Sequence, residues 1–252
     1  TITGQGSNSI KVEGHRIKKG KKTDQFFSKV YSKSTSKEIW IYGLDDDDYF
    51  DVKNITKSMP KLRIVGGQNN DIYDVGEGSG TYVYDYKSKK NTFKNISRAK
   101  VRLTDNYEVN TYRPLKFRSS TNQIIPTIGF NPDDGVKIGI SDTYTFNGFR
   151  QNPFTQKHHV AASYYFATSG FDIAYQGEFA NVFGKSNLEI DAHFTSPNFA
   201  INFFGFGNNT ENLDDELELD YNRVRFSTLD FAPYLVWRGP LGSKFRTGIT
   251  YE

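Results

Sequence analysis

The chain has 252 residues, which is enough for one large domain or two small ones. Lysine and arginine number 32 against 29 aspartates and glutamates, and this near balance argues against nucleic acid as a partner. The absence of cysteine excludes disulfides and thiolate metal sites, and an aromatic content of 15% is typical of strand-rich proteins. No apolar run approaches the roughly 18 residues of a membrane helix.

A short signature recurs in the first half of the chain: an acid or amide, any residue, then an aromatic. It occurs at Asp24–Phe26, Asp48–Phe50, Asp71–Tyr73, Asn91–Phe93 and Asn110–Tyr112. Successive copies begin 24, 23, 20 and 19 residues apart, which is the period range of a solenoid rung. We therefore expect a β-solenoid repeat domain over residues 1–114, with about five rungs.

Two of these units align without gaps, IWIYGLDDDDYFDV (39–52) and LRIVGGQNNDIYDV (62–75). In each, a short apolar strand leads to glycine, then to a polar loop, then to the signature. The third and fourth units keep the strand and lose the glycine, as expected for rungs near the end of a stack.

The segment GGQNNDIY (66–73) resembles the calcium-binding nonapeptide of RTX β-rolls, with an asparagine where that motif has its third glycine. The aligned unit contributes a run of four aspartates, and calcium prefers such hard oxygen ligands. The candidate calcium ligands are Asp45, Asp46, Asp47, Asp48, Asn69 and Asp71.

A purely structural role for the same residues is the alternative. Asp48 and Asp71 would accept hydrogen bonds from backbone amides in the turns, while Phe50 and Tyr73 would fill the core.

Beyond residue 115 the pattern changes to strict alternation. The segment FDIAYQGEF (171–179) places Phe171, Ile173 and Tyr175 on one face of a strand and acidic or amide side chains on the other. We expect about eight strands, at 122–131, 135–147, 157–168, 170–180, 186–196, 198–207, 221–237 and 242–252. Most are long enough to cross a bilayer at a tilt, and tight turns alternate with longer loops.

This second half therefore predicts an antiparallel transmembrane β-barrel segment over residues 115–252. A soluble antiparallel barrel or sandwich with one wet face is the alternative.

We identify no catalytic constellation. His158 and His159 are adjacent, so on a strand they face opposite ways and cannot share a metal. The chain contains no Ser-His-Asp spacing, no phosphate-binding loop and no metallophosphoesterase signature.

The stretch PTIGFNPDDGVKIGI (126–140) resembles the opening hairpin of Omp85 or surface-antigen (D15) barrels. Together with the two glycine-containing repeats, it is similar to the C-terminal portion of large Bacteroidota outer-membrane proteins that join a calcineurin-like metallophosphoesterase to a surface-antigen-like barrel. The phosphoesterase ligands are not in this chain, so the resemblance implies that any such activity lies in a missing N-terminal part. It also implies an incomplete barrel, because eight strands fall short of sixteen.

The resemblance further implies a bacterial outer-membrane location, with the solenoid in the periplasm. The expected partners are outer-membrane lipid and other outer-membrane proteins or their assembly machinery. The edge of the first barrel strand would pair with an incoming strand, since unpaired edge amides template strand addition. The edge residues are Ile124, Ile125, Thr127, Ile128 and Phe130. A non-catalytic anchor for a phosphoesterase and a calcium-binding, adhesin-like surface module are the alternative functions.

Overall fold

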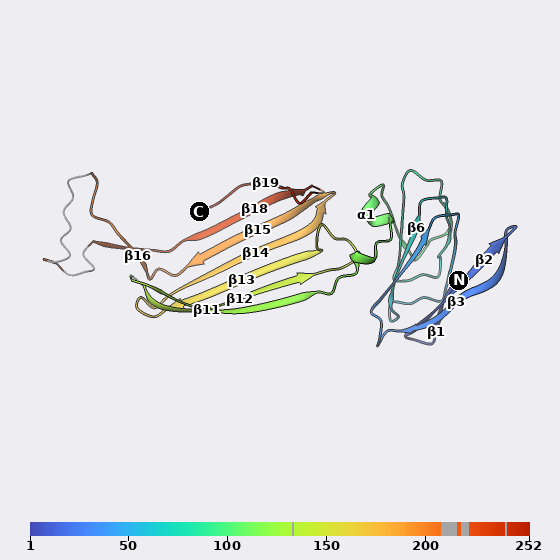
Figure 1. The fold of residues 1–252 in the computed structure, drawn as a ribbon, viewed down its shortest axis with the longest axis horizontal. Coiled ribbons are helices and arrows are strands. Elements are labelled where there is room, and N and C mark those ends of the chain that lie inside the picture. The colour runs from blue at the N-terminus through green and yellow to red at the C-terminus, as the bar shows by residue number, and fades with distance from the viewer. Residues whose placement is uncertain (133, 208–215, 218–221, 240) are drawn as a thin grey trace. The chain divides into compact units, whose positions relative to one another are not determined.

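The computed structural model describes residues 1–132, 134–207, 216–217, 222–239 and 241–252. They form two compact units, Thr1–Lys116 and Phe117–Glu252, and each is described by itself. The fold is all-β apart from a four-residue helix and one 3-10 turn (Figure 1). No helix in the described part of the chain is long and apolar enough to cross a bilayer.

The first unit contains two sheets and the short helix. The six-stranded sheet has the order β3-β2-β1-β5-β7-β9, and the four-stranded sheet has the order β10-β8-β6-β4. The elements of this unit are β1 (Ile2–Gln5), β2 (Ser9–Lys18), β3 (Lys21–Ser32), β4 (Glu38–Leu44), β5 (Tyr49–Lys53), β6 (Lys61–Gly67), β7 (Ile72–Asp74), β8 (Thr81–Asp85), β9 (Thr92–Asn95), β10 (Lys100–Leu103), α1 (Tyr107–Asn110) and η1 (Pro114–Lys116).

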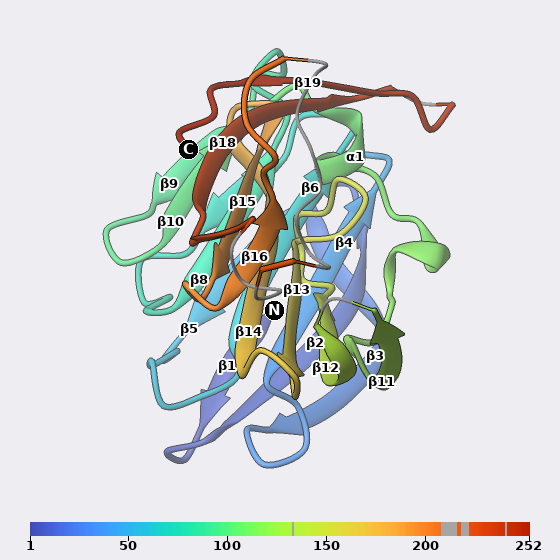
Figure 2. The ribbon, with the colours of Figure 1, turned by 90° about the vertical axis from the view of Figure 1, so that its left-hand side faces the viewer.

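Three successive turns of the chain form the predicted β-solenoid. Each turn places one strand in each sheet: β4 with β5, β6 with β7, and β8 with β9. Neighbouring turns pair in parallel, as β4, β6 and β8 show (Figure 2). The solenoid prediction is thus confirmed, with about three turns in place of the expected five.

The first and last copies of the signature do not form rungs. Asp24 and Phe26 lie on β3, which pairs antiparallel with β2, and Phe26 is 69% exposed. Asn110 ends helix α1, which Asn106 caps by accepting a hydrogen bond from the Glu108 amide. A three-residue pattern is short enough to arise by chance in a strand or at a helix end, and this explains both errors.

The core of the solenoid is a column of stacked side chains. Tyr73 lies between Phe50 and Phe93, with ring centroids 5.3 and 5.2 Å apart and interplanar angles of 11° and 12°. In the facing sheet Ile39 lies opposite Leu62, and Ile41 lies opposite Ile64. Each rung therefore buries its apolar residues against the equivalent residues of the next rung.

The second unit is built on one antiparallel sheet of seven strands, in the order β11-β12-β13-β14-β15-β18-β19. Six of these strands have between 10 and 14 residues. The strands of this unit are β11 (Thr121–Asn131), β12 (Gly135–Phe146), β13 (Gln156–Tyr165), β14 (Gly170–Phe183), β15 (Ser186–Thr195), β16 (Phe199–Asn202), β17 (Arg223–Phe226), β18 (Leu229–Arg238) and β19 (Lys244–Gly248).

The predicted strands at 198–207 and 221–237 differ from the structure. β16 leaves the main sheet and pairs with β17 as a separate hairpin, while β18 pairs with β15. β16 ends at Asn202, and beyond it Gly205 and Gly207 have φ values of 101° and 108°, which are not those of a strand. The main sheet therefore has seven strands among the described residues. Most of the predicted loop at 207–221, and Asp133 in the β11–β12 turn, lie outside them.

Candidate functional site

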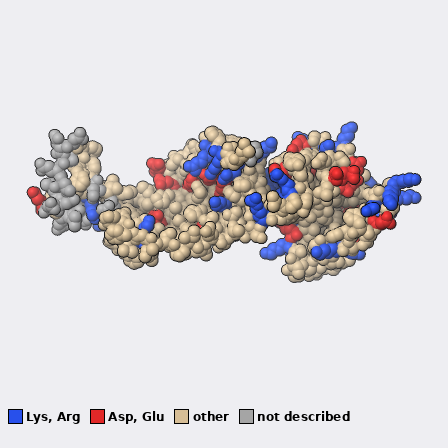
Figure 3. Space-filling view, viewed as in Figure 1, with Lys and Arg blue, Asp and Glu red and all other residues tan. Residues whose placement is uncertain are grey.

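One face of the seven-stranded sheet is apolar and exposed. Directly opposed residues on neighbouring strands point to the same face, so the pairing register identifies its rows. One row contains Pro126, Ile140, Ala162, Ile173, Phe194 and Leu229. The next contains Ile128, Ile138, Tyr164 and Phe171. Ile128 is 82% exposed. In the view of Figure 3, charged side chains gather over one part of this unit and largely uncharged surface covers the rest.

The opposite face is polar and carries two buried carboxylates. Glu178 and Glu189 are 5% and 1% exposed. Arg238 donates to both Glu178 oxygens, at 2.9 and 2.6 Å, and Asn187 donates to Oε1 at 2.7 Å. In a water-soluble sheet the apolar side chains are buried and the charged side chains are exposed. Here the arrangement is the reverse, because the carboxylates are buried and the apolar side chains are exposed.

Glu189 joins the last three strands of the sheet. It accepts hydrogen bonds from Lys244 and, at 2.7 Å, from Arg246 on β19. Arg246 also lies 3.3 Å from an Asp191 oxygen and stacks its guanidinium over the Tyr234 ring at 4.4 Å. These cations balance the carboxylates within the polar face.

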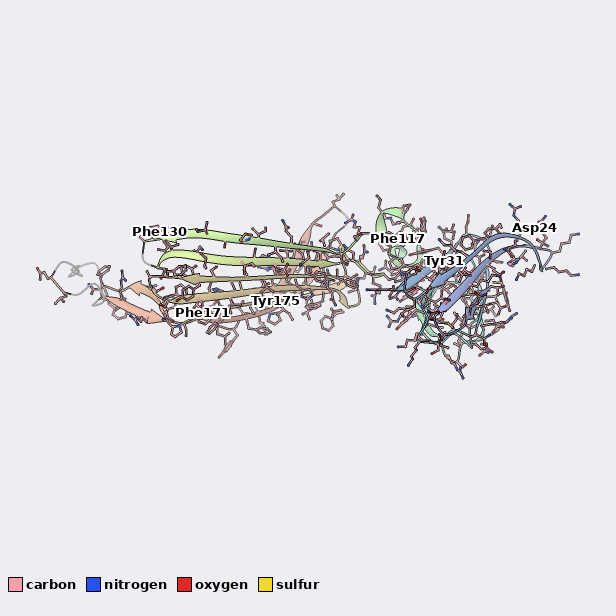
Figure 4. The ribbon with its side chains drawn as sticks, turned by 90° about the horizontal axis from the view of Figure 1, so that it is seen from below. Asp24, Tyr31, Phe117, Phe130, Phe171 and Tyr175 are labelled. Atoms are coloured by element: carbon pink, nitrogen blue, oxygen red, sulfur yellow. The ribbon has the colours of Figure 1, made fainter. Side chains whose placement is uncertain are left out.

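Aromatic clusters flank the apolar band along the strands. At one end His158 stacks near Tyr144 and contacts the Tyr175 hydroxyl through Nδ1 at 2.9 Å. At the other end Tyr164 meets Phe166 edge to face at 5.3 Å. Figure 4 shows Phe171 and Tyr175 at separate positions along β14. Amphipathic rings at both borders of an apolar band are typical of membrane interfaces.

The predicted edge residues lie on β11, whose outer side pairs with no other strand among the described residues. Ile124, Ile128 and Phe130 face the apolar side, whereas Ile125 and Thr127 face the polar side. Pro126 interrupts this edge. Proline has no backbone N–H, and within a sheet it is found where that N–H would point away from the neighbouring strand. At position 126 the outer side of β11 therefore lacks one hydrogen-bond donor. The edge therefore has a gap in its middle.

In the solenoid, the signature acids form a ladder of side-chain to backbone hydrogen bonds. Asp71 Oδ1 accepts from the Asp48 amide at 2.8 Å, and Asn91 Oδ1 accepts from the Asp71 amide at 2.8 Å. Asp47 accepts from the Asn70 amide at 3.2 Å. These bonds tie each rung to the next. Asp71 accepts from a backbone amide as the structural alternative predicted, whereas Asp48 takes part through its own amide and its Oδ2 accepts no hydrogen bond.

Asp71 lies in a buried cluster of acids that sequence reasoning missed. Asp71 and Asp85 are 1% and 0% exposed, and Tyr73 donates its hydroxyl to Asp85 at 2.5 Å. Asp85 occupies the position that Gly66 holds one rung earlier, so continuing the alignment of the repeats would have found it. A Cβ at Gly66 would overlap Asp71, Tyr73 and Asp85, and glycine there makes the cluster possible.

Burial raises the pKa of Asp71 to about 7, and the charges of Asp85 and Asp48 act in the same direction. The pKa of Asp85 is also raised by burial, although hydrogen bonds from Tyr73 and the Tyr86 amide oppose this. Asp71 Oδ2 is buried and accepts no hydrogen bond. A buried carboxylate without a hydrogen-bond partner is costly, and this favours the protonated form of Asp71. When Asp71 is protonated, this oxygen can donate a hydrogen bond to Asp85.

The six candidate calcium ligands do not converge. Asp45 and Asp46 are exposed on the first loop, Asp47 and Asp48 take part in the ladder, and Asn69 is half-buried. In the part of the chain that the structure describes, no three acidic or histidine side chains are placed to hold a metal ion. Calcium binding stays a prediction.

The raised pKa of Asp71 predicts an unusual pH dependence of solenoid stability. The folded state holds this proton more tightly than the unfolded state, so its stabilising contribution is complete below about pH 4 and is lost as the pH rises through about 7. Asp71→Asn keeps a donor toward Asp85 and carries no charge. We expect it to raise the free energy of unfolding at pH 8 by on the order of 3 kcal/mol, with little change at pH 4.5.

Urea titrations at pH 4.5, 6 and 8 would measure this difference, with the exposed Asp24→Asn as the matched control. Burial also raises the pKa of Asp48, to about 6, so the variant keeps part of the pH slope. An Asp71→Asn profile parallel to that of the wild type would show that Asp71 is ionised in the folded protein.

Comparison with known proteins gives no further assignment: no family model, curated protein or solved structure matches this chain.

Proposed function

We propose that the second unit is part of an outer-membrane β-barrel of the surface-antigen type, and that it anchors the chain in the lipid bilayer. The inverted arrangement of the seven-stranded sheet carries this proposal. Isoleucine and aromatic residues cover the exposed face, while the acidic side chains are paired on the other face. An exposed face of apolar side chains is stable in contact with the hydrocarbon of a lipid bilayer.

Strand length and the aromatic borders support the same proposal. Six strands have 10 to 14 residues, and about 9 to 11 tilted residues cross the hydrocarbon core. The aromatic clusters around His158 and Tyr164 would lie at the two headgroup regions.

The free edge of β11 supports an additional function beyond anchoring. In this function the barrel assists the insertion or transport of other outer-membrane components. Unpaired backbone groups on the outer side of β11 would pair with an incoming strand. Pro126 divides this edge, so strand addition would begin on one side of it.

The two tryptophans allow a direct test of membrane insertion. Trp237 is on β18 in the apolar face, whereas Trp40 is in the solenoid. In vesicles that contain brominated lipid, we expect strong quenching of Trp237 fluorescence, measured in a Trp40→Phe variant. The Trp237→Phe variant, which reports on Trp40 alone, is the control and should be quenched little. Equal quenching of both, or recovery of the chain without vesicles after flotation, would contradict membrane insertion.

A further inference from the structure

The two sheets of the solenoid do not end together on the side of β4. The four-stranded sheet stops at β4, whereas the facing sheet continues past β5 with β1, β2 and β3. β2 and β3 form an antiparallel hairpin at this end of the larger sheet. The unequal length of the two sheets leaves a space between β4 and the β2–β3 hairpin.

A cavity of about 760 Å³ occupies this space, and we term it the hairpin groove. Its floor contains apolar side chains at the end of the core, among them Ile2, Val12 and Ile39, which are at most 9% exposed. Phe26 and Phe27 of β3 also line the groove and are 69% and 40% exposed. A cavity of this size is in the range of small-molecule sites, and a bound hydrocarbon chain would cover the exposed rings.

The local geometry of the hairpin brings both phenylalanine rings to the groove. The register of β2 against β3 shifts at His15, so Phe26 and Phe27 both line the groove although they are adjacent in sequence. A Cβ at Gly14 would overlap the Phe26 ring, and glycine at this position therefore gives the ring its place. Figure 4 shows Asp24 near the outer end of the hairpin and Tyr31 further back along it.

Charges of both signs meet at the open end of the groove. β1 runs parallel to β5 and antiparallel to β2, so the tip of the hairpin lies toward the start of β5, which the acidic loop 45–48 precedes. Residues 16–22 at the tip include five lysine and arginine residues and no acid, and Figure 3 shows blue side chains at this tip. Lys22 from the hairpin and Asp47 and Asp48 from the loop all line the groove.

The other two carboxylates of the lining already have cationic partners. Glu13 and Asp51 lie 2.8 and 3.0 Å from lysines of their own strands. In the described part of the chain Lys22 pairs with no carboxylate, and its Nζ donates to the Thr1 hydroxyl at 3.0 Å. Burial and the neighbouring aspartates raise the pKa of Asp48 to about 6, as expected for a carboxylate that lacks a cation.

We propose that the hairpin groove binds a zwitterionic amphiphile, with its hydrocarbon chain along the apolar floor and its two charges at the open end. A phosphate would lie against Lys22 and the other lysines of the hairpin tip, and an ammonium against Asp47 and Asp48. A single-chain phosphoethanolamine lipid has this chemistry. An amphiphile with one charge would leave the groups of the opposite sign without a partner.

This inference concerns the first unit alone and does not rest on membrane insertion of the second. The probe is lysophosphatidylethanolamine with a photoactivatable diazirine on its acyl chain, used below its micelle concentration with the full chain held in amphipol. We expect saturable cross-links to Phe26, Phe27 and Ile39, mapped by mass spectrometry. Lysophosphatidylglycerol and hexadecyltrimethylammonium, which each carry one charge, should compete at least about fivefold more weakly than unlabelled lysophosphatidylethanolamine.

Two charge reversals test which side chains hold the two charges. Lys22→Glu should weaken binding of the probe about tenfold and make hexadecyltrimethylammonium the better competitor. Asp47→Lys should weaken binding by a similar factor and make lysophosphatidylglycerol the better competitor. Lys89→Glu is the matched control, because Lys89 is exposed in the loop after β8 and does not line the groove, and it should change neither.

Phe27→Ser tests the apolar wall of the groove. We expect it to weaken binding of the probe about tenfold, because the ring no longer covers the hydrocarbon chain. Val30→Ser is the control on the same strand, since Val30 is 51% exposed and does not line the groove, and it should leave binding unchanged.

Absence of saturable cross-links in the hairpin groove would overturn the proposal, as would binding that Lys22→Glu, Asp47→Lys and Phe27→Ser all leave unchanged. Equal competition by the three amphiphiles would show that the groove takes a hydrocarbon chain regardless of its head group, and would contradict the zwitterionic ligand. Cross-links that form only with vesicles of phosphatidylethanolamine, and not with the single-chain probe, would identify contact with a bilayer surface instead.

Discussion

Replacing Tyr73 by alanine is expected to lower the free energy of unfolding of the solenoid by about 3–5 kcal/mol, the range for a buried aromatic. Tyr73 is fully buried, stacks on both Phe50 and Phe93, and donates its hydroxyl to Asp85. Its loss would open a cavity in the middle rung and leave Oδ2 of the buried Asp85 without its donor. Hydrogen exchange of β6 and β8 amides in urea would measure the change.

Two further tyrosine variants separate these contributions. Tyr73→Phe keeps the stacked ring and removes only the hydroxyl, so we expect a loss of roughly 1–3 kcal/mol from the Asp85 Oδ2 atom that loses its donor. Tyr107→Ala, at a position that is 56% exposed, should change the stability by less than about 0.5 kcal/mol. If Tyr73→Ala behaved like Tyr107→Ala, the aromatic column would not be what holds the rungs together.

Replacing Glu189 by alanine is expected to destabilise the last strands of the sheet by about 1.5–3 kcal/mol, because it removes hydrogen bonds between a buried carboxylate and two cations. Glu189 is 1% exposed and accepts from both Lys244 and Arg246, so Lys244 would lose this acceptor and Arg246 would keep only its contacts with Asp191 and Tyr234. The measurement is hydrogen exchange of the β18 and β19 amides in detergent. We expect β19 to lose its protection first.

Asp191→Ala provides the matched control for this prediction. Its carboxylate is 3.3 Å from the same Arg246 and is 30% exposed, so solvent screens the contact and the expected loss is below about 1 kcal/mol. Equal effects of the two substitutions would show that burial does not strengthen the Glu189 contacts.

Repetition made the solenoid predictable from sequence. The two aligned units share a strand, a glycine and an acid, and the structure keeps the same register, with Gly43 opposite Gly66 between the pairs Tyr42–Val65 and Leu44–Gly67. The third rung was harder to interpret because Asp85 replaces the glycine. Its carboxyl fills the space beside Asp71 and Tyr73, so the lost glycine marks a specific buried cluster and not merely a degenerate repeat.

Alternation predicted the two faces of the second unit, since a period of two assigns each side chain on a strand to one face. It could not predict which strands pair. The departure of β16 from the main sheet depends on contacts with β17, more than 20 residues later, and local patterns carry no information about such contacts. The ionic contacts of Glu189 with β19 were missed for the same reason.

The central claim is that the apolar face of the seven-stranded sheet contacts lipid. Because the chain has no cysteine, single cysteines can be introduced along β12 and spin-labelled without background. In vesicles, we predict that labels at Val136, Ile138 and Ile140 are accessible to lipid-soluble oxygen, whereas labels at Lys137, Gly139 and Ser141 are accessible to a water-soluble nickel chelate. Accessibility to the chelate at all six positions, without alternation, would contradict the claim.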